Sequence, residues 1–493
     1  MGYQPSSELE TLIEQLVGEE KDQFFASLGN QFPHTIRFNT LLGDEEELAD
    51  FFAEQGFRFE PFPGLPGVYR ILFQPYPIGK SLSHFLGHIY VQDVSSMLPP
   101  MVLQPQPGDR VMDMSAAPGS KTTQMAIMMQ NSGFILANDI VPKRLRALIN
   151  NLQRMGIANT AVVKNYGESL GNTYFETFDK ILLDPACSGL GTLHKNPEVL
   201  SWWTENHCIR LASGQRQMLK SALKALKPGG EMVYSTCTLT PQENEEVLDF
   251  ALNEFPIEIL PINLPGLVTR PGLTSFQDKS YHPQVANSIR IYPFENQTEG
   301  FFVAKIRKIG PMEKDSRKRQ RDPLKFDYIS HNTSPVKKYL DYLSMHLGIE
   351  RKEFSRFRYF LGKDILAVTP ELAEFPFRSK PMRAGITIGR PLTQAAKLTT
   401  EGCLMFGAKA TKNIFRLNNL EELHRFVNRE EFDSSTPLGG QVLVRYRNFN
   451  IGYGLADGEK LKSQFPKAEW PFQVTQTERE EDVAGREKEE EGE

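Results

Sequence analysis

The stretch RVMDMSAAPGSK at residues 110–121 decides the fold of this 493-residue chain. Its apolar start, 110–114, predicts a strand, and the small residues that follow turn the chain into a helix expected at 120–130. Small side chains let a backbone approach a ligand closely, and the first turn of a helix presents free amides. The stretch therefore predicts a loop for a nucleoside cofactor, although its spacing matches neither the Walker pattern nor GxGxxG.

Strands and helices alternate after this loop, which predicts an α/β protein with a doubly wound, Rossmann-like sheet. At the end of the next strand stands Asp139, where such sheets bind their ligands. A carboxylate there can accept both hydroxyls of a ribose, whereas the alternative is that Asp139 only caps the helix starting near Pro142. We expect further strands at 134–138, 161–164, 180–183 and 232–235, helices at 143–155 and 207–226, and a final antiparallel hairpin from 288–292 and 301–306.

Composition divides the rest of the chain into flanking regions. We expect a small N-terminal α+β module at 1–82, the α/β domain at 83–308, a basic linker at 309–333, a strand-rich region at 334–474 and an acidic disordered tail at 475–493. The tail holds nine acidic against three basic residues, and 305–325 holds nine basic against three acidic residues. The segment 351–360 interleaves cations with aromatics, which suits either a nucleic-acid surface or an amphipathic helix with its aromatics in a core.

Two of the four cysteines follow predicted strands. Cys187 lies shortly after Asp184 in one loop, and Cys237 begins another, so both are expected at the carboxyl edge of the sheet. A thiolate that adds to C6 of a cytosine makes C5 able to attack a sulfonium methyl. Asp184 could meet the N3 and N4 edge of that base as charge develops. Cys208 and Cys403 are expected to be small buried hydrophobic side chains.

Four stretches carry a family signature: Tyr90–Pro99, Ala116–Gln124, Lys195–Glu198 and Tyr234–Glu245. Together they resemble the RNA 5-methylcytosine methyltransferases of the Sun/Fmu family, and within it the branch of ribosomal small-subunit methyltransferase F. The resemblance implies a class I methyltransferase core at 83–308. More weakly, Thr35–Leu41 resembles the family's N-terminal motif in an RNA-binding module, and Gln441–Lys467 resembles its C-terminal PUA-like RNA-binding region.

The resemblance also implies a role for each candidate residue. Cys237 would be the nucleophile, Cys187 the thiol that aids product release, Asp184 the residue that orients the cytosine, and Lys121 a contact to cofactor or base. The cofactor S-adenosyl-L-methionine would be bound by Ser115, Ala116, Ala117, Pro118, Gly119, Ser120, Lys121, Asp139, Tyr166 and Asp184.

The sequence departs from the family in two places. The family usually has Asp-Ala-Pro-Cys, whereas this chain has Asp184-Pro185-Ala186-Cys187. Pro185 fixes φ one residue earlier, which bears on the orientation of Cys187. The family often carries an acidic residue where this chain has Tyr166, so Tyr166 would stack on the adenine or the contact would be absent.

The resemblance defines the expected partner as RNA, foremost 16S-type rRNA in the small ribosomal subunit or its precursor, with tRNA as the runner-up. One alternative is an RNA-binding assembly factor that has lost turnover through its altered Asp184–Cys187 loop. Another is methylation of an amino group, which needs no thiol. The sequence shows no long apolar run, signal segment or CxxC pair, so we expect a cytoplasmic protein without a membrane segment or a metal.

Overall fold

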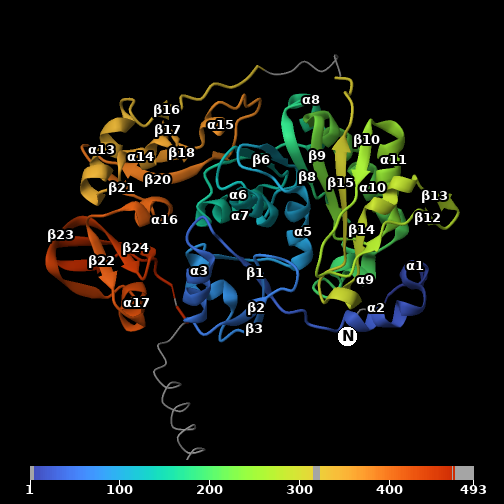
Figure 1. Cartoon of the computed structure of the whole chain (residues 1–493), viewed down its shortest axis with the longest axis horizontal. Helices are drawn as coiled ribbons and strands as arrows, with labels where there is room; N and C mark the ends of the chain where they lie inside the picture. Colours follow the sequence, from blue (N-terminus) through green and yellow to red (C-terminus); the bar gives the residue numbers. More distant parts are fainter. Residues whose placement is uncertain (1–4, 315–321, 469, 472–493) are drawn as a thin grey trace, which may run out of the picture.

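The computed structural model describes residues 5–314, 322–468 and 470–471. A central α/β sheet is flanked by the first module and by the C-terminal region from residue 329 onward (Figure 1). The predicted acidic tail lies outside the described residues, as do residues 315–321 of the predicted basic linker. The predicted division into domains stays a prediction, and several contacts described below cross its boundaries.

Ten described strands form the central sheet, in the order β11-β14-β15-β9-β8-β5-β6-β7-β19, with β10 paired to β15. Strands β5 to β9 run parallel, and β14 and β15 form the predicted antiparallel hairpin. The Rossmann-like class of fold is thereby confirmed. The bounds are β5 Arg110–Asp113, β6 Phe134–Asn138, β7 Thr160–Val163, β8 Phe178–Leu183, β9 Leu226–Thr236, β10 Ile257–Leu260, β11 Arg270–Pro271, β14 Ile289–Ile291, β15 Phe301–Lys308 and β19 Arg383–Ala384, with a separate hairpin of β12 Ser275–Phe276 and β13 Lys279–Ser280.

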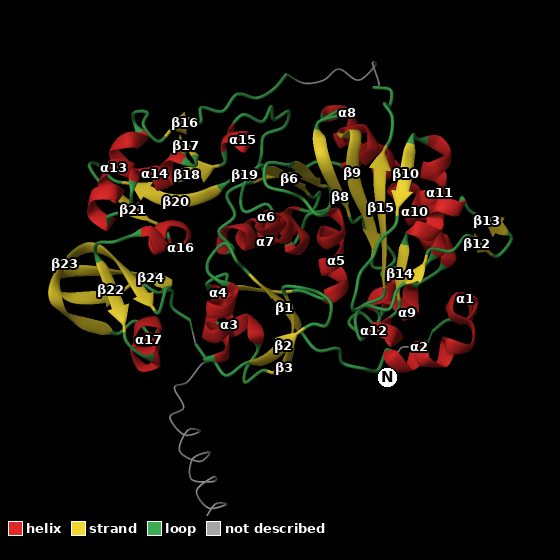
Figure 2. Cartoon of the chain, viewed as in Figure 1, coloured by secondary structure: helices red, strands yellow, loops and turns green. Residues whose placement is uncertain are grey.

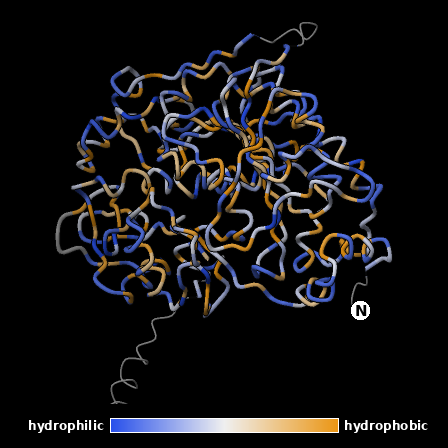
Figure 3. Tube along the Cα trace, turned by 45° about the vertical axis from the view of Figure 1, so that its right-hand side comes forward, coloured by the Kyte–Doolittle hydropathy of each residue, from blue (hydrophilic) through white to orange (hydrophobic). Residues whose placement is uncertain are grey.

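Helices cover both faces of this sheet (Figure 2). One face carries α5 Val94–Leu103, α6 Ser120–Met128 and α7 Pro142–Arg154, and the other carries α8 Gly167–Thr173, α10 Glu205–Ala225 and α11 Glu245–Glu254. Because both faces are covered, all five residues of β6 are buried. Hydrophobic residues accordingly fill the central strands, and hydrophilic ones mark the outer loops (Figure 3). Shorter helices follow β8 and β14: α9 Val199–Trp202 and α12 Pro293–Asn296.

Local sequence explains where these helices start and stop. Helix α7 begins at Pro142, which suits the first helical turn, and buries Leu145, Leu148 and Leu152 at helical spacing. Helix α10 begins after Thr204, whose hydroxyl accepts the amide of a residue in the first turn. It ends at Ala225, before the Pro-Gly-Gly segment at 228–230 that predicted its end, and that segment is part of β9.

The N-terminal module is an antiparallel sheet in the order β2-β3-β1-β4. It reaches past the expected limit at residue 82, because β4 spans Ile89–Val91 and pairs with β1. Its first two helices instead pack against the central core through buried residues such as Leu9, Ile13 and Phe24. The other bounds are α1 Ser7–Val17, α2 Lys21–Ser27, β1 Thr35–Phe38, α3 Glu45–Ala53, β2 Arg58–Pro61, β3 Val68–Phe73 and α4 Leu82–Phe85.

The C-terminal region contains two sheets, β16-β17-β18-β20-β21 and β22-β23-β24. Between β18 and β20 the chain returns to the central domain, where β19 pairs with the edge strand β7 and Phe375 packs on Phe134. The bounds are β16 Ile329–Ser330, α13 Val336–Leu347, α14 Arg351–Ser355, β17 Arg358–Leu361, β18 Ile365–Val368, α15 Pro370–Ala373, β20 Ile386–Pro391, β21 Ala396–Leu398, α16 Thr400–Phe406, β22 Ile414–Leu417, α17 Leu420–Val427, β23 Glu431–Tyr446 and β24 Phe449–Ser463.

The first and last modules share one hydrophobic core, although they lie at opposite ends of the sequence. Phe51 of α3 packs against Tyr446 and Phe449 of the β23–β24 hairpin. At the rim, Asn448 donates to Glu47 over 2.6 Å. The two modules therefore pack against one another (Figure 1).

The structure shows the surroundings of two charged segments that the sequence singled out. Residues 305–308, counted in the basic stretch, are the end of β15, and Lys305 and Arg307 form ion pairs with Glu231 at 3.2 and 3.0 Å. The segment 351–360 is a short helix followed by a strand, and three of its four aromatic side chains are buried. The core interpretation holds for those three, while Phe360 is 37% exposed.

Candidate active site

A cavity of ≈ 480 Å³ opens at the carboxyl ends of β5, β6, β7, β8 and β9. Parallel strands place the ends of their backbones and the following loops together at this edge. The residues of the predicted set that line the cavity are Ser115, Ala116, Ala117, Pro118, Ser120, Lys121, Asp139, Tyr166, Asp184, Cys187 and Cys237. Gly119 is next to the wall, with a φ of 109° that favours glycine.

The loop after β5 is held from below by Asp113. One carboxylate oxygen of Asp113 accepts the Thr122 hydroxyl at 2.7 Å, which ties the strand end to the first turn of α6. Complete burial raises the pKa of Asp113 to about 7, against these hydrogen bonds and the nearby Lys121 cation, which lower it. The Ala116 amide donates to the Asn138 carbonyl at 2.7 Å, so the loop is also fixed to β6.

Asp139 lies almost fully buried at the end of β6. Its Oδ1 accepts the amide of Val141, the N-cap residue of α7, at 2.9 Å, so it orders the turn before the helix and does not cap the helix itself. Its Oδ2 is 3.4 Å from the Arg144 guanidinium but has no hydrogen-bond partner among the described residues. One oxygen therefore serves the backbone, and the other is left for a ligand in the cavity.

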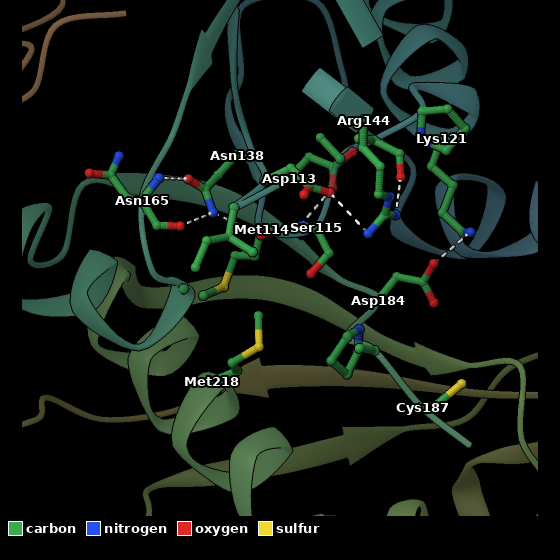
Figure 4. A pocket seen from close by; sticks show the side chains of 18 of the residues that line it. Asp113, Met114, Ser115, Lys121, Asn138, Arg144, Asn165, Asp184, Cys187 and Met218 are labelled. Atoms are coloured by element: carbon green, nitrogen blue, oxygen red, sulfur yellow. Dashed lines mark hydrogen bonds and ion pairs between the residues drawn. The ribbon is translucent and has the colours of Figure 1, made fainter. Parts of the chain in front are cut away.

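The far end of the cavity contains Tyr166, whose side chain is 68% exposed, and the buried Asn138. Asn138 donates to the Met114 and Asn165 carbonyls, both at 3.1 Å, and accepts the Asn165 amide at 2.9 Å (Figure 4). The side-chain amide of Asn138, at the end of β6, therefore joins the loops that follow β5 and β7. Sequence reasoning missed both asparagines, and the only available signal was the position of Asn138 immediately before Asp139.

Lys121 and Asp184 face one another across the cavity wall (Figure 4). Lys121 Nζ lies 2.7 Å from Asp184 Oδ2 and 3.0 Å from Ser96 Oγ, and the Ser235 hydroxyl donates to Asp184 Oδ1 at 3.1 Å. Burial lowers the pKa of Lys121, but Asp184, Asp113 and Cys237 together raise it by more, so its net pKa lies above the ordinary value. The pair thus presents a fixed ammonium and carboxylate to the cavity.

The two thiols predicted to act together meet: Cys187 Sγ lies 3.1 Å from Cys237 Sγ. The exchanged Pro185 and Ala186 therefore leave the Cys187 side chain directed at its expected partner. The hydrogen bond to Cys237, together with burial, holds the pKa of Cys187 well above its ordinary value. Cys187 is then a neutral thiol that can donate a hydrogen bond to a thiolate at Cys237.

The described part of the chain contains no group of three or more His, Cys, Asp or Glu residues that could hold a metal ion. Within the same residues, no helix is both long enough and apolar enough to cross a bilayer. Cys208 and Cys403 are buried, as their sequence contexts predict.

Comparison with known proteins finds two family models in this chain. One, described as "16S rRNA methyltransferase RsmB/F", matches residues 100–307, and the other, "Methyltransferase RsmF PUA domain", matches residues 412–469. The second match begins just before β22, so the sheet of β16 to β21 precedes it in the chain.

Individual relatives agree with these models. Ribosomal RNA small subunit methyltransferase F of Shewanella piezotolerans is 31% identical over 88% of this chain and 90% of its own length. The tRNA (cytosine(49)-C(5))-methyltransferase of Pyrococcus abyssi is 40% identical over 59% of this chain and 93% of its own. The solved structure of a methyltransferase homolog protein from Pyrococcus horikoshii matches with a TM-score of 0.55 and 37% identity, covering 60% of this chain and 93% of that one.

The sheet, its loops and these matches define a class I methyltransferase. The chain belongs to the RNA cytosine-C5 methyltransferases, in the RsmB/F family, with a PUA domain at its C-terminal end.

Proposed function

We propose that this enzyme methylates C5 of a cytosine in RNA with S-adenosyl-L-methionine, through a covalent bond between Cys237 and C6 of the base. The observation that carries the proposal is the 3.1 Å contact between the two sulfurs at the carboxyl ends of β8 and β9. The same cavity wall holds Lys121 and Asp184. Transfer of a methyl group to an amino group, the competing chemistry, uses no thiol and gives no reason for this arrangement.

The cavity suits the cofactor because its polar groups are left open where a nucleoside needs them. Asp139 Oδ2, buried and without a hydrogen-bond partner among the described residues, would accept a ribose hydroxyl. The loop 115–121 would hold the amino-acid end, and Tyr166 offers an exposed ring to the adenine. When bound, S-adenosyl-L-methionine supplies a methyl group on a sulfonium.

Base activation falls to Cys237, Asp184 and Lys121. The Cys237 thiolate forms a bond to C6, and the electrons of the C5–C6 double bond move toward N3 and C5. The Asp184 carboxylate would accept a hydrogen bond from the N4 amino group of the cytosine and so orient the ring. The Lys121 ammonium, 2.7 Å from Asp184, offsets the negative charge that develops on the base.

Release of the product falls to Cys187. After C5 has received the methyl group, its proton leaves to a base and the bond from Cys237 to C6 breaks, which restores the aromatic ring. The Cys187 thiol, with its raised pKa, donates a hydrogen bond to the departing sulfur. Loss of this donor would leave the protein attached to its RNA.

The substrate we propose is rRNA of the small ribosomal subunit or its precursor, in the cytoplasm. The support is the share of this chain that each relative matches. The methyltransferase F relative from Shewanella matches 88% of this chain, including its C-terminal region, whereas the tRNA enzyme from Pyrococcus matches 59%. A tRNA substrate is the alternative. Bisulfite sequencing of RNA from cells with and without the gene decides between them, since the modified cytosine disappears from one RNA class only.

Trapping with 5-fluorocytidine tests the chemistry, because fluorine at C5 cannot leave as a proton does. RNA carrying this base, incubated with the cofactor and the protein, should give an adduct that survives a denaturing gel. Cys237→Ala should abolish the adduct, and alanine in place of Cys403, which is buried on helix α16 of the C-terminal region, should retain it. No adduct from the intact protein would favour the RNA-binding assembly factor, and full methylation by Cys237→Ala would favour amino-group chemistry.

A further inference from the structure

A buried polar cluster lies beneath the two thiols and joins the loops that carry them. Ser188, next to Cys187, shares a hydrogen bond of 2.7 Å with the Thr238 hydroxyl, next to Cys237. The Ser188 amide donates to both carboxylate oxygens of Glu243, each at 2.9 Å. All three of these polar residues are fully buried. The loops after β8 and β9 are thus connected through side chains that do not themselves line the cavity.

Glu243 is anchored to the sheet independently of its carboxylate. The Tyr234 hydroxyl donates to the Glu243 carbonyl at 2.6 Å, which fixes the main chain to β9. The carboxylate then points to the loop after β8, where Gln215 provides a second link by donating to the Ala186 carbonyl at 3.0 Å. Burial raises the pKa of Glu243 to about 7, while the hydrogen bonds from Ser188 and Gln215 oppose that rise.

The loop that carries Cys237 has contacts of its own. The Cys237 carbonyl accepts a hydrogen bond from the Gly191 amide at 2.9 Å. On either side, Asn244 accepts the Thr236 hydroxyl at 2.6 Å and donates to the Thr238 carbonyl at 3.0 Å. Removal of the Glu243 carboxylate therefore leaves the nucleophile held, but takes away the acceptor of the Ser188 amide and so loosens the backbone beside Cys187, where the Gln215 link remains.

We propose that Glu243 is a positioning residue for product release: its carboxylate, bonded to the Ser188 amide, keeps the Cys187 sulfur against Cys237. This inference rests on the proposed covalent mechanism and assigns its two steps, formation and breakdown of the adduct, to different supporting contacts. Addition of the thiolate to C6 depends on the contacts of Cys237, whereas breakdown of the methylated adduct depends on Glu243. A purely structural role for Glu243 would weaken both steps together.

The test compares Glu243→Ala and Glu243→Gln with Cys187→Ala and with Glu246→Gln. Glu246, in the first turn of the following helix α11, forms ion pairs with Arg216 and Lys279 outside the cluster, so it controls for loss of a charge. Each variant receives cofactor and either ordinary small-subunit rRNA transcript or the same transcript with 5-fluorocytidine. The readouts are turnover, adduct on denaturing gels, and the thermal midpoint of each protein.

We expect Glu243→Ala to trap 5-fluorocytidine RNA as the intact protein does, to accumulate adduct on ordinary RNA as Cys187→Ala does, and to lose turnover by about tenfold or more, the worth of one buried charge-assisted bond. Glu243→Gln keeps one acceptor oxygen and should give the same pattern more weakly. If Glu243→Ala does not fold, Glu243→Gln tests the inference in its place.

Equal loss of trapping and turnover in a folded Glu243 variant would overturn the inference, as would turnover equal to that of Glu246→Gln. Failure of the intact protein to trap 5-fluorocytidine RNA would instead remove the covalent mechanism itself.

Discussion

Asp139→Asn isolates one oxygen atom of the cofactor site. The change preserves the shape of the side chain, and an amide oxygen at the Oδ1 position can still accept the Val141 amide, now at 2.9 Å. At the Oδ2 position it replaces an acceptor with an NH₂ donor. This side chain is 3% exposed, and Oδ2 lies 3.4 Å from the Arg144 guanidinium without a hydrogen-bond partner among the described residues. A charge-assisted hydrogen bond is worth about 1.5–3 kcal/mol. We therefore expect cofactor affinity to fall about tenfold to a hundredfold.

Isothermal titration with S-adenosyl-L-homocysteine measures this loss without turnover. Asp109→Asn is the matched control, because Asp109 lies at the opposite end of β5 and its side chain accepts a local amide in the turn before it, from Gln106. A dissociation constant for Asp139→Asn within twofold of the control would refute the reasoning, and would leave Asp139 as a residue that orders the turn before α7. Unfolding in urea should show both variants close to the original protein.

Three further predictions concern other parts of the molecule. Phe449→Ala opens the core shared by the first and last modules and should lower the free energy of unfolding by about 3–5 kcal/mol in urea, where a loss below about 1 kcal/mol would contradict the shared core. Gly191→Ala would put a methyl group 1.9 Å from the Gly300 carbonyl oxygen and 2.9 Å from that of Cys237, so turnover should fall while cofactor affinity is retained. Because burial raises the pKa of Asp113 from 3.8 to about 7, the folded state holds an extra proton in that window, and stability should decrease by up to a few kcal/mol as pH rises through it. Asp113→Asn should show less of this decrease, and parallel urea curves at pH 5 and pH 8 would argue against it.

The central domain could be predicted closely because its signals are local. Strand β6 is a continuous apolar run between turns, and α7 combines a first-turn proline with leucines at helical spacing. The surroundings of the basic stretch at 305–325 could not be predicted in this way, because a count of charges does not show which acidic side chains pair with the basic ones. Lys305 and Arg307 lie on β15, and their partner is Glu231 of the neighbouring strand β9, far away in sequence.

The candidate site divides in the same way. Its cavity-lining residues lie directly after strands, so alternation alone brings Asp139, Asp184, Cys187 and Cys237 to one edge of the sheet. Residues that support the site from beneath carry no such mark. Glu243 lies within a motif, but its contact with Ser188 depends on how two loops pack.

From its residues alone this chain specified a doubly wound sheet, a nucleoside loop and two thiols at strand ends, because spacing and side-chain size act over a few residues at a time. Only the tertiary structure decided that the sulfurs lie 3.1 Å apart, that Asp139 keeps an open oxygen, and that the first and last modules form one core. Those facts depend on distances between segments remote in sequence, which are set when the whole chain buries its apolar surface and satisfies its polar groups together.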